Sequence, residues 1–218
     1  MTELRARTPD EAYLFVELLL GREEPVDLHR VTGLVLDTER PVVRVNGLHA
    51  GHHHEFDIAL PPISHDPVIP GELYGTGRTP SSLIDAGQWR AVELWACSTL
   101  DQLLAQVGGR GLDRTAVEDI GYHVDTAYSA LAEITKFLPQ GAAEVPAEAF
   151  WTTDGLAIRG SQPDAFRRER ILADEEHYRG MGEELSARQG QLGDAAGPPV
   201  EAIGGLARAE IYSSLPQK

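Results

Sequence analysis

Apolar and polar residues alternate with a period of two between Val31 and Leu60, which is the pattern of half-buried β-strands. The apolar runs cover residues 31–36, 42–45 and 54–60. Turn-forming residues separate these runs, so the pattern predicts a three-stranded antiparallel meander. Four prolines follow within residues 61–70, and proline has no N–H to donate to a neighbouring strand. Residues 61–79 are therefore predicted to form an irregular connection.

A short helix is predicted ahead of the meander. Thr8 suits its N-cap, Pro9 suits the first helical position, and Glu11 lies three residues after the cap, as in a capping box. Gly21 is expected to end this helix.

Three longer helices are predicted in the second half of the chain, where apolar residues recur every three or four positions. They are expected to begin at residues 79–81, at Thr115 and near Pro163. The middle helix has the most regular apolar stripe: Val117, Ile120, Val124, Ala127, Leu131, Ile134 and Leu138. Because a short Gly-rich turn joins it to the helix before, the two should form an antiparallel helical hairpin. The last helix should bury Phe166, Ile171, Tyr178 and Leu185, and residues 150–155 should form a loop.

These elements predict an α+β fold with an N-terminal helix, a three-stranded antiparallel meander, a helical hairpin and a further long helix. We expect a single domain over residues 1–189, in which residues 1–62 form the helix and meander and residues 79–189 the helical part. Residues 190–218, rich in Gly, Pro and Ala, are expected to be a flexible or loosely docked tail. With 218 residues, 42% of them hydrophobic, the chain is long enough to bury a core.

The chain is acidic, with 34 Asp and Glu against 19 Lys and Arg and a formal net charge of -15. The excess is spread along the sequence, so it should belong to the folded surface. This balance argues against binding nucleic acid or an anionic membrane and favours a basic partner. Cys97 is the only cysteine, which excludes a disulfide framework and a thiolate zinc site. Without a signal sequence or an apolar run long enough to span a membrane, the protein is expected to be cytoplasmic.

Four of the eight histidines lie in the turn of the predicted hairpin, at residues 49, 52, 53 and 54. On a strand, His53, Glu55 and Asp57 point to the same face, away from the core. Imidazole and carboxylate groups together can bind zinc or iron, and His49 or His65 could supply a second imidazole. The metal-ligand candidates are His49, His52, His53, Glu55 and Asp57. The favoured alternative is a solvated polar face that binds metal only adventitiously, since the sequence shows too few strands for a cupin-like barrel.

Other reactive groups are expected to be structural. Asp174 and His177 have the acid-x-x-His spacing of di-iron bundles, but the second pair is missing, so a charged helix face is predicted. The thiol of Cys97 lies in an apolar stripe and should be buried and inert. No nucleophile elbow is present, and the Gly-rich loop at 71–78 lacks a Walker lysine. No catalytic or cofactor-binding residue is assigned. Trp95 lies outside the main stripe of its helix and is the candidate anchor for a partner.

Five segments of the chain carry a resemblance to a known family: residues 5–12, 82–89, 133–139, 145–151 and 166–170. They resemble an uncharacterised family of small bacterial proteins with a zinc-ribbon-like N-terminal half and a helical C-terminal half. The resemblance implies paired cysteines before the first strand and in the hairpin. At those places this chain has Leu19-Leu20-Gly21 and residues 47–51, without cysteine. Because this chain departs from the family pattern at both places, we expect a degenerate ribbon that folds without metal.

The leading hypothesis from the sequence is a non-enzymatic, acidic, cytoplasmic domain that binds another protein, a basic one, as an immunity or antitoxin-like factor does. The immunity role is an analogy. A metal-dependent enzyme or metal-binding protein, using zinc or iron at residues 49–57, is the alternative, so enzymatic activity stays open although the sequence leans against it. A third possibility is a homodimer formed through the two central helices.

Overall fold

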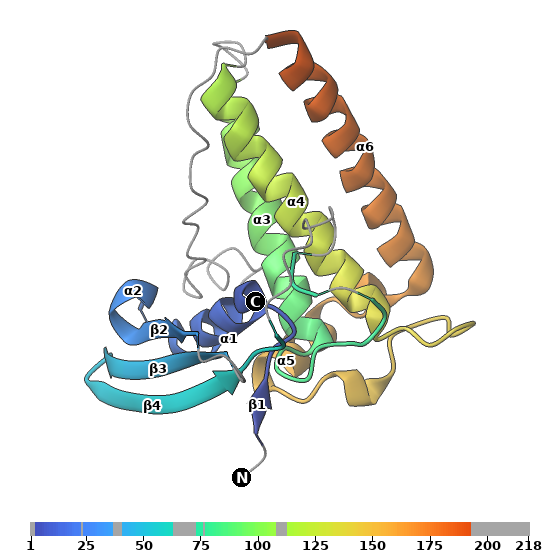
Figure 1. Cartoon of the computed structure of the whole chain (residues 1–218). Helices are drawn as coiled ribbons and strands as arrows, with labels where there is room; N and C mark the ends of the chain where they lie inside the picture. The colour runs from blue at the N-terminus through green and yellow to red at the C-terminus, as the bar shows by residue number, and fades with distance from the viewer. Residues whose placement is uncertain are drawn as a thin grey trace.

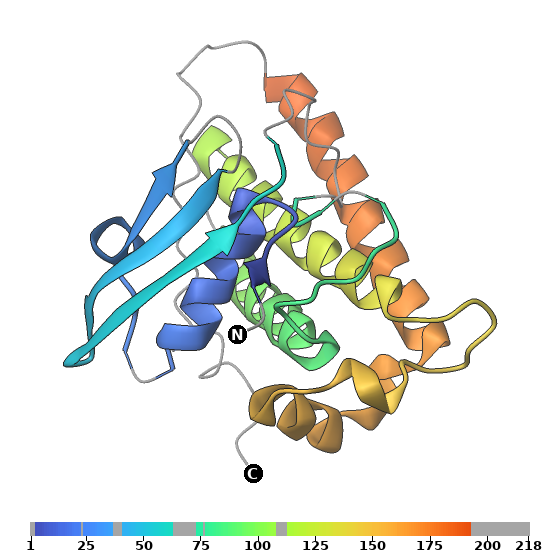
Figure 2. The ribbon, with the colours of Figure 1, turned by 60° about the horizontal axis from the view of Figure 1, so that its bottom comes forward.

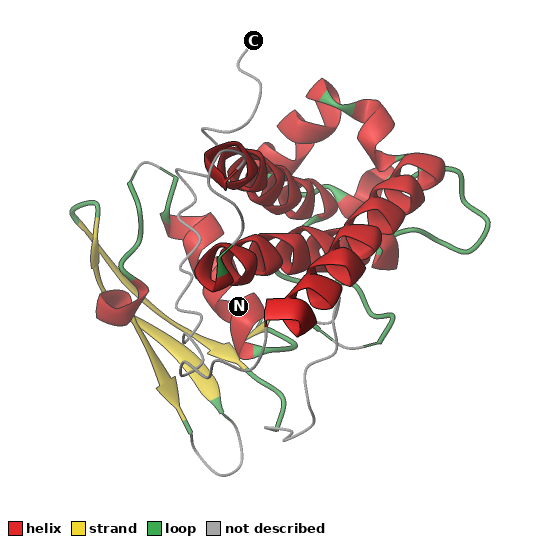
Figure 3. Cartoon of the chain, turned by 90° about the horizontal axis from the view of Figure 1, so that it is seen from above, coloured by secondary structure: helices red, strands yellow, loops and turns green. Residues whose placement is uncertain are grey.

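The computed structural model describes residues 3–22, 24–36, 41–62, 73–75, 77–107 and 113–192. They form a mixed α+β fold, with a four-stranded sheet at one side and three long helices at the other (Figures 1 and 3). The long helices are α3 (Ala86–Val107), α4 (Arg114–Lys136) and α6 (Arg168–Leu192). Helix α1 (Pro9–Leu20) lies between the sheet and the long helices (Figure 2). The predicted α+β class is confirmed.

The sheet has the strand order β1-β4-β3-β2. Its strands are β1 (Leu4–Arg5), β2 (Thr32–Val35), β3 (Val42–His49) and β4 (His52–Ala59). Strands β2, β3 and β4 are antiparallel neighbours, which confirms the predicted meander. The prediction of only three strands was wrong, because β1 pairs in parallel with β4 and makes the sheet mixed. A strand of two residues is too short to show a period of two.

Helix α1 begins as its sequence predicts. The hydroxyl of Thr8 accepts a hydrogen bond from the backbone N–H of Glu11 at 3.1 Å. The carboxylate of Glu11 turns back and accepts from the backbone N–H of Arg7 at 2.6 Å, one residue before the usual capping-box donor. The helix ends at Leu20, where the N–H of Gly21 donates to the carbonyl of Glu17 at 2.8 Å.

The predicted starts of the next two helices were wrong. Helix α3 begins at Ala86, because Asp85 and Gln88 form a reciprocal cap. Oδ1 of Asp85 accepts a hydrogen bond from the backbone N–H of Gln88 at 2.8 Å. Oε1 of Gln88 accepts one from the backbone N–H of Asp85 at 3.2 Å. Helix α4 begins at Arg114, since the carboxylate of Asp113, not Thr115, caps its first turn. In both cases a nearby aspartate is the cap in place of the predicted position.

Shorter helices complete the described part of the chain: α2 (Leu28–Val31), η1 (Ala147–Ala149), α5 (Thr153–Ser161) and η2 (Pro163–Phe166). Helix α5 corrects the predicted loop at 150–155, because the hydroxyl of Thr152 accepts from the N–H of Gly155 at 2.9 Å and caps a new helix. The last long helix follows η2 and starts at Arg168 rather than near Pro163. The turn before α4 and the predicted tail beyond residue 192 lie outside the described residues.

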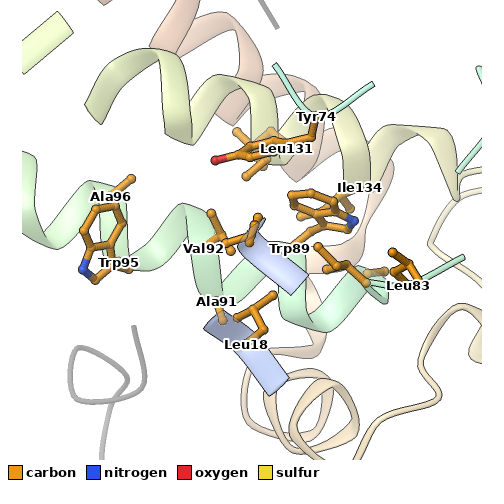
Figure 4. Packing of buried hydrophobic residues seen from close by; sticks show 14 of the residues in the cluster. Leu18, Tyr74, Leu83, Trp89, Ala91, Val92, Trp95, Ala96, Leu131 and Ile134 are labelled. Carbon is orange, nitrogen blue, oxygen red and sulfur yellow. The ribbon is translucent and has the colours of Figure 1, made fainter. Parts of the chain in front are cut away.

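One hydrophobic core joins the helical and β parts. The predicted stripe of α4 is buried along its whole length, which confirms that prediction. Trp89 of α3 is fully buried beside Ile134, and its ring centroid lies 4.9 Å from that of Tyr74 (Figure 4). Leu18 of α1 belongs to the same core, which also contains Ile58 of the sheet. None of the described helices is long and apolar enough to cross a membrane.

Candidate functional site

The histidine-rich hairpin turns through Ala50 and Gly51, which have φ angles of 49° and 76°. Two successive positive φ angles are typical of a type I′ turn, whose twist matches that of the flanking strands. The turn places His49 directly opposite His52 and Leu48 opposite His53. Paired residues in a sheet point to the same face, so His49 and His52 share one face and His53 lies on the other.

His49 is buried and held by protein groups. Its Nε2 lies 3.1 Å from the carbonyl oxygen of Leu20, a geometry in which the ring nitrogen donates a hydrogen bond. Its Nδ1 lies 3.9 Å from Oε1 of Glu24, and the same oxygen accepts from the N–H of Ala50 at 2.9 Å. This imidazole fixes the hairpin against the end of α1, and its Nε2 is already engaged.

Three of the other predicted ligands, at residues 53, 55 and 57, lie on the opposite face, and His52 shares the face of His49; all four are exposed. His53, Glu55 and Asp57 alternate with Phe56, Ile58 and Leu60 as predicted, with Ile58 and Leu60 buried and Phe56 half-buried. Asp57 forms a two-bond ion pair with Arg44, at 2.9 and 3.0 Å, and these hydrogen bonds lower the pKa of its carboxyl.

The described side chains contain no group of three or more His, Cys, Asp or Glu residues that could hold a metal ion. Since His49 and His53 lie on opposite faces, the predicted ligand set is not brought together. His65 lies outside the described residues, and the zinc or iron site stays a prediction.

The tryptophans differ in exposure. Trp95 is only 7% exposed, and its ring lies edge-on to His123 with 5.0 Å between centroids. It belongs to the core and offers little surface to the partner that it was expected to anchor. Trp151 is 45% exposed and Leu156 is 52% exposed, at the two positions of a hydrophobic staple around the cap of α5.

A buried ionic cluster joins α1, α4 and the segment before α3. The guanidinium of Arg7 lies between two carboxylates, 2.5 Å from Glu11 and 2.7 Å from Glu133, which are 1% and 0% exposed. The ammonium of Lys136 lies 2.7 Å from Glu133 and donates to the carbonyl of Gly75. Burial raises the pKa of Glu133, and the two cations act against this rise.

A second buried cluster fixes α6 against α3. The guanidinium of Arg90 lies 3.1 Å from Asp174 and 3.3 Å from Glu93, and the hydroxyl of Tyr178 donates to Glu93 at 2.8 Å. Burial raises the pKa of Glu93, against the effect of Arg90 and Tyr178. Burial also raises the pKa of the Cys97 thiol, which is half-buried rather than fully buried as predicted; its inertness stays a prediction.

These contacts change the prediction for Asp174 and His177. Asp174 turns inward to Arg90 and also pairs with Arg170 on its own helix, whereas His177 is exposed. The first half of α6 is therefore held by buried charges. Thr135 of α4 adds a hydrogen bond to Glu175 at 2.6 Å.

A cleft of about 290 Å³ lies between the first half of α4 and the second half of α6. Helix α4 lines it with Val117, Glu118, Gly121, Tyr122, Val124 and Asp125, and helix α6 with Gly182, Leu185 and Ser186. The two glycines leave space on opposite walls. A Cβ atom at Gly121 would meet no atom within 4 Å, and one at Gly182 would meet only Val124, at 3.9 Å.

The helix segments that line the cleft are strongly acidic. Residues 113–125 and 182–186, which we call the acidic end, contain six acidic residues and one basic residue. The one base, Arg114, is already paired with Glu118 at 2.8 Å. Asp125 is exposed, and partial desolvation raises the pKa of its carboxyl. The described residues provide no cation in an ion pair with Asp125.

Sequence reasoning missed this cleft. Its signal was the pair of glycines inside two otherwise regular helical patterns, where glycine is unfavourable and suggests a packing or functional reason. Which helices face each other could not be read from the pattern of either helix alone.

No family model, curated protein or solved structure matches the chain. The functional inference therefore depends on the geometry and charge of the described residues.

Proposed function

We propose that this protein is a non-enzymatic domain that works in the cytoplasm by binding a basic protein through its acidic end, in the manner of an immunity or antitoxin-like factor. The observation that carries the proposal is that the two helix segments around the cleft contain six acidic residues and only one basic residue. Arg114 pairs with Glu118 and offsets one of the six acidic charges, which leaves a net excess of five on these segments.

Electrostatics explains why such a surface favours a basic partner. Like charges gathered on one end produce a local potential that attracts cationic surfaces and speeds their association, while the total charge of -15 repels anionic ones. The second buried cluster fixes the part of α6 that precedes this surface, since Arg90 and Tyr178 tie the first half of the helix to the core.

A comparison of two charge variants tests the proposal. In the acidic-end variant, four exposed acids are made neutral: Asp119→Asn, Asp125→Asn, Glu183→Gln and Glu184→Gln. A control variant has the same change in net charge elsewhere on the surface: Glu55→Gln, Glu144→Gln, Glu148→Gln and Glu169→Gln. The two proteins then have the same net charge, and the four lost charges lie at different places on the surface.

The untagged wild-type chain is immobilised and exposed to extract of its own cell at about 50 mM salt, and retained proteins are eluted at about 500 mM, where screening is nearly complete. A retained basic protein is identified, purified and titrated against all three forms. We expect the acidic-end variant to bind about tenfold more weakly and the control to stay within about twofold, which corresponds to losing several exposed charge pairs. Retention of no basic protein, or equal weakening by both variants, would contradict the proposal.

A further inference from the structure

We propose that the α4–α6 cleft is a socket for one arginine side chain of the basic partner, with the carboxylate of Asp125 as its counter-ion. This inference rests on the proposed function and names the contact that would give it specificity. Charge complementarity carries it: the cleft offers Glu118 and Asp125, and no lysine or arginine is among the described residues that line it.

The size of the cleft fits a single side chain. At about 290 Å³ it lies at the lower limit of pockets that hold drug-sized ligands, which start near ~300 Å³. Gly121 and Gly182 leave space on both walls, since an added Cβ would meet nothing within 4 Å at Gly121 and only Val124, at 3.9 Å, at Gly182. A long side chain can therefore enter between the helices without moving their backbones.

The lining matches the two parts of an arginine side chain. The half-buried Leu185 provides apolar surface for the methylene groups, while Val117 and Val124, each 1% exposed, form the apolar floor beneath it. At the polar edge, the carboxylate of Asp125 can accept two parallel N–H bonds from a guanidinium, and the ring of Tyr122 can stack against its plane. A lysine ammonium would use the charge but not the planar geometry, which is why arginine is favoured.

Asp125 is the carboxylate that gains most from such a partner. It is exposed in the lining of the cleft, and the described residues give it no ion pair, so its carboxylate can accept an incoming cation without breaking an existing salt bridge. Glu118, in contrast, is already paired with Arg114.

A cleft-filling substitution tests the socket without changing any charge. Gly182→Leu places a side chain in the cleft, and Gly121→Leu does the same from the other wall; neither Cβ atom meets a steric conflict. Gly180→Leu is the matched control, because it adds the same side chain to the same helix, outside the cleft lining and with no atom within 4 Å of its Cβ. Helix content measured by circular dichroism confirms that each variant is folded.

The probe is argininamide, titrated into the isotopically labelled full chain and followed by NMR, with lysinamide as the second cation. We expect saturable shifts at the backbone amides of Gly121, Tyr122 and Gly182, with a Kd in roughly the millimolar range. Gly182→Leu and Asp125→Asn should each weaken argininamide binding by about tenfold, while Gly180→Leu should change it by less than about twofold.

Several outcomes would overturn the socket: equal binding of lysinamide, shifts that do not saturate, or unchanged binding of argininamide by both cleft-filling variants.

The proposed function can be refuted independently of the socket. If the purified partner is lost with the acidic-end variant but binds the Gly182→Leu protein normally, the socket is wrong and the acidic docking surface stands. If argininamide binds the cleft but no basic protein is retained from extract, the socket stands and the proposed function is wrong.

Discussion

Replacement of Arg7 by methionine removes the one guanidinium that separates two buried carboxylates. The guanidinium contacts Glu11 and Glu133, which are 1% and 0% exposed, so neither can recover its lost partner from water. Breaking a buried ion pair by removing one member typically costs 3–5 kcal/mol. Lys136 still neutralises part of the charge of Glu133 at 2.7 Å, so we expect a loss of about 3 kcal/mol in the free energy of unfolding at about pH 7.

The pH dependence of this loss provides an internal check. Burial already raises the pKa of Glu133 in the wild type, and removal of Arg7 should raise it further. A carboxyl group whose pKa is higher in the folded than in the unfolded state destabilises the folded state above its folded pKa, and this cost disappears as the pH falls below the unfolded value. The destabilisation by Arg7→Met should therefore shrink as the pH is lowered from about 7 to about 5.

The assay is urea unfolding followed by tryptophan fluorescence, for Arg7→Met, Glu133→Gln and the double variant. Arg7 and Glu133 are in contact, so the effects of their substitutions on the free energy of unfolding should not be additive. We expect the double variant to lose about 1–3 kcal/mol less than the sum of the losses of the two single variants. Arg5→Met, which breaks an exposed pair with Glu3, is the control and should cost no more than about 1 kcal/mol. A cost below about 1 kcal/mol for Arg7→Met, or additive effects within about 0.5 kcal/mol, would refute this account of the cluster.

Three further substitutions test local features by the same unfolding assay. Gly121→Ala should stabilise the protein by about 0.5–1 kcal/mol, because the site is helical and an added Cβ meets nothing within 4 Å; a loss of stability would show that the cleft is filled. Gly87→Ala should destabilise by about 3 kcal/mol, since its Cβ would lie 2.4 Å from the backbone of Gly155, and a neutral result would mean that α3 and α5 separate easily. Asp85→Ala should lower the free energy of unfolding by about 3 kcal/mol, because it removes the cap of α3 and the acceptor for the N–H and hydroxyl of Thr152. A loss below about 1 kcal/mol would contradict the role of Asp85 in both contacts.

Local pattern was enough to predict the elements with a long, regular period. The stripe of α4 from Val117 to Leu138 and the alternation in β4 are properties of neighbouring residues, and both are confirmed. Helix α5 was missed although Thr152 is a good N-cap, because nine residues with two glycines give a weak helical pattern. The start of α3 was misplaced because residues 79–81 resemble a helix start as closely as Asp85 and Gln88 do.

Features that depend on contacts distant in sequence could not be predicted. Strand β1 is defined by its pairing with β4, more than fifty residues later. The cleft exists because α6 lies beside α4, and that position is fixed by the contact of Arg90 with Asp174, 84 residues apart. The histidine cluster shows the converse situation: four imidazoles lie close in sequence, but the pleat of the sheet sends His49 and His53 to different sides.

The position of Arg7 limits how this protein can be dissected. Its side chain connects the first turn of α1, the interior of α4 and the carbonyl of Thr79, so the amino-terminal segment closes the helical part of the molecule. A fragment that starts after the sheet would leave the buried Glu133 without Arg7, and a fragment that ends before α3 would lose the core residues on which α1 packs. We therefore expect neither half to fold when it is expressed alone. Deletion variants that lose binding to a partner would then be misfolded and would not identify the residues that contact it. Point substitutions are the appropriate tool for mapping that surface.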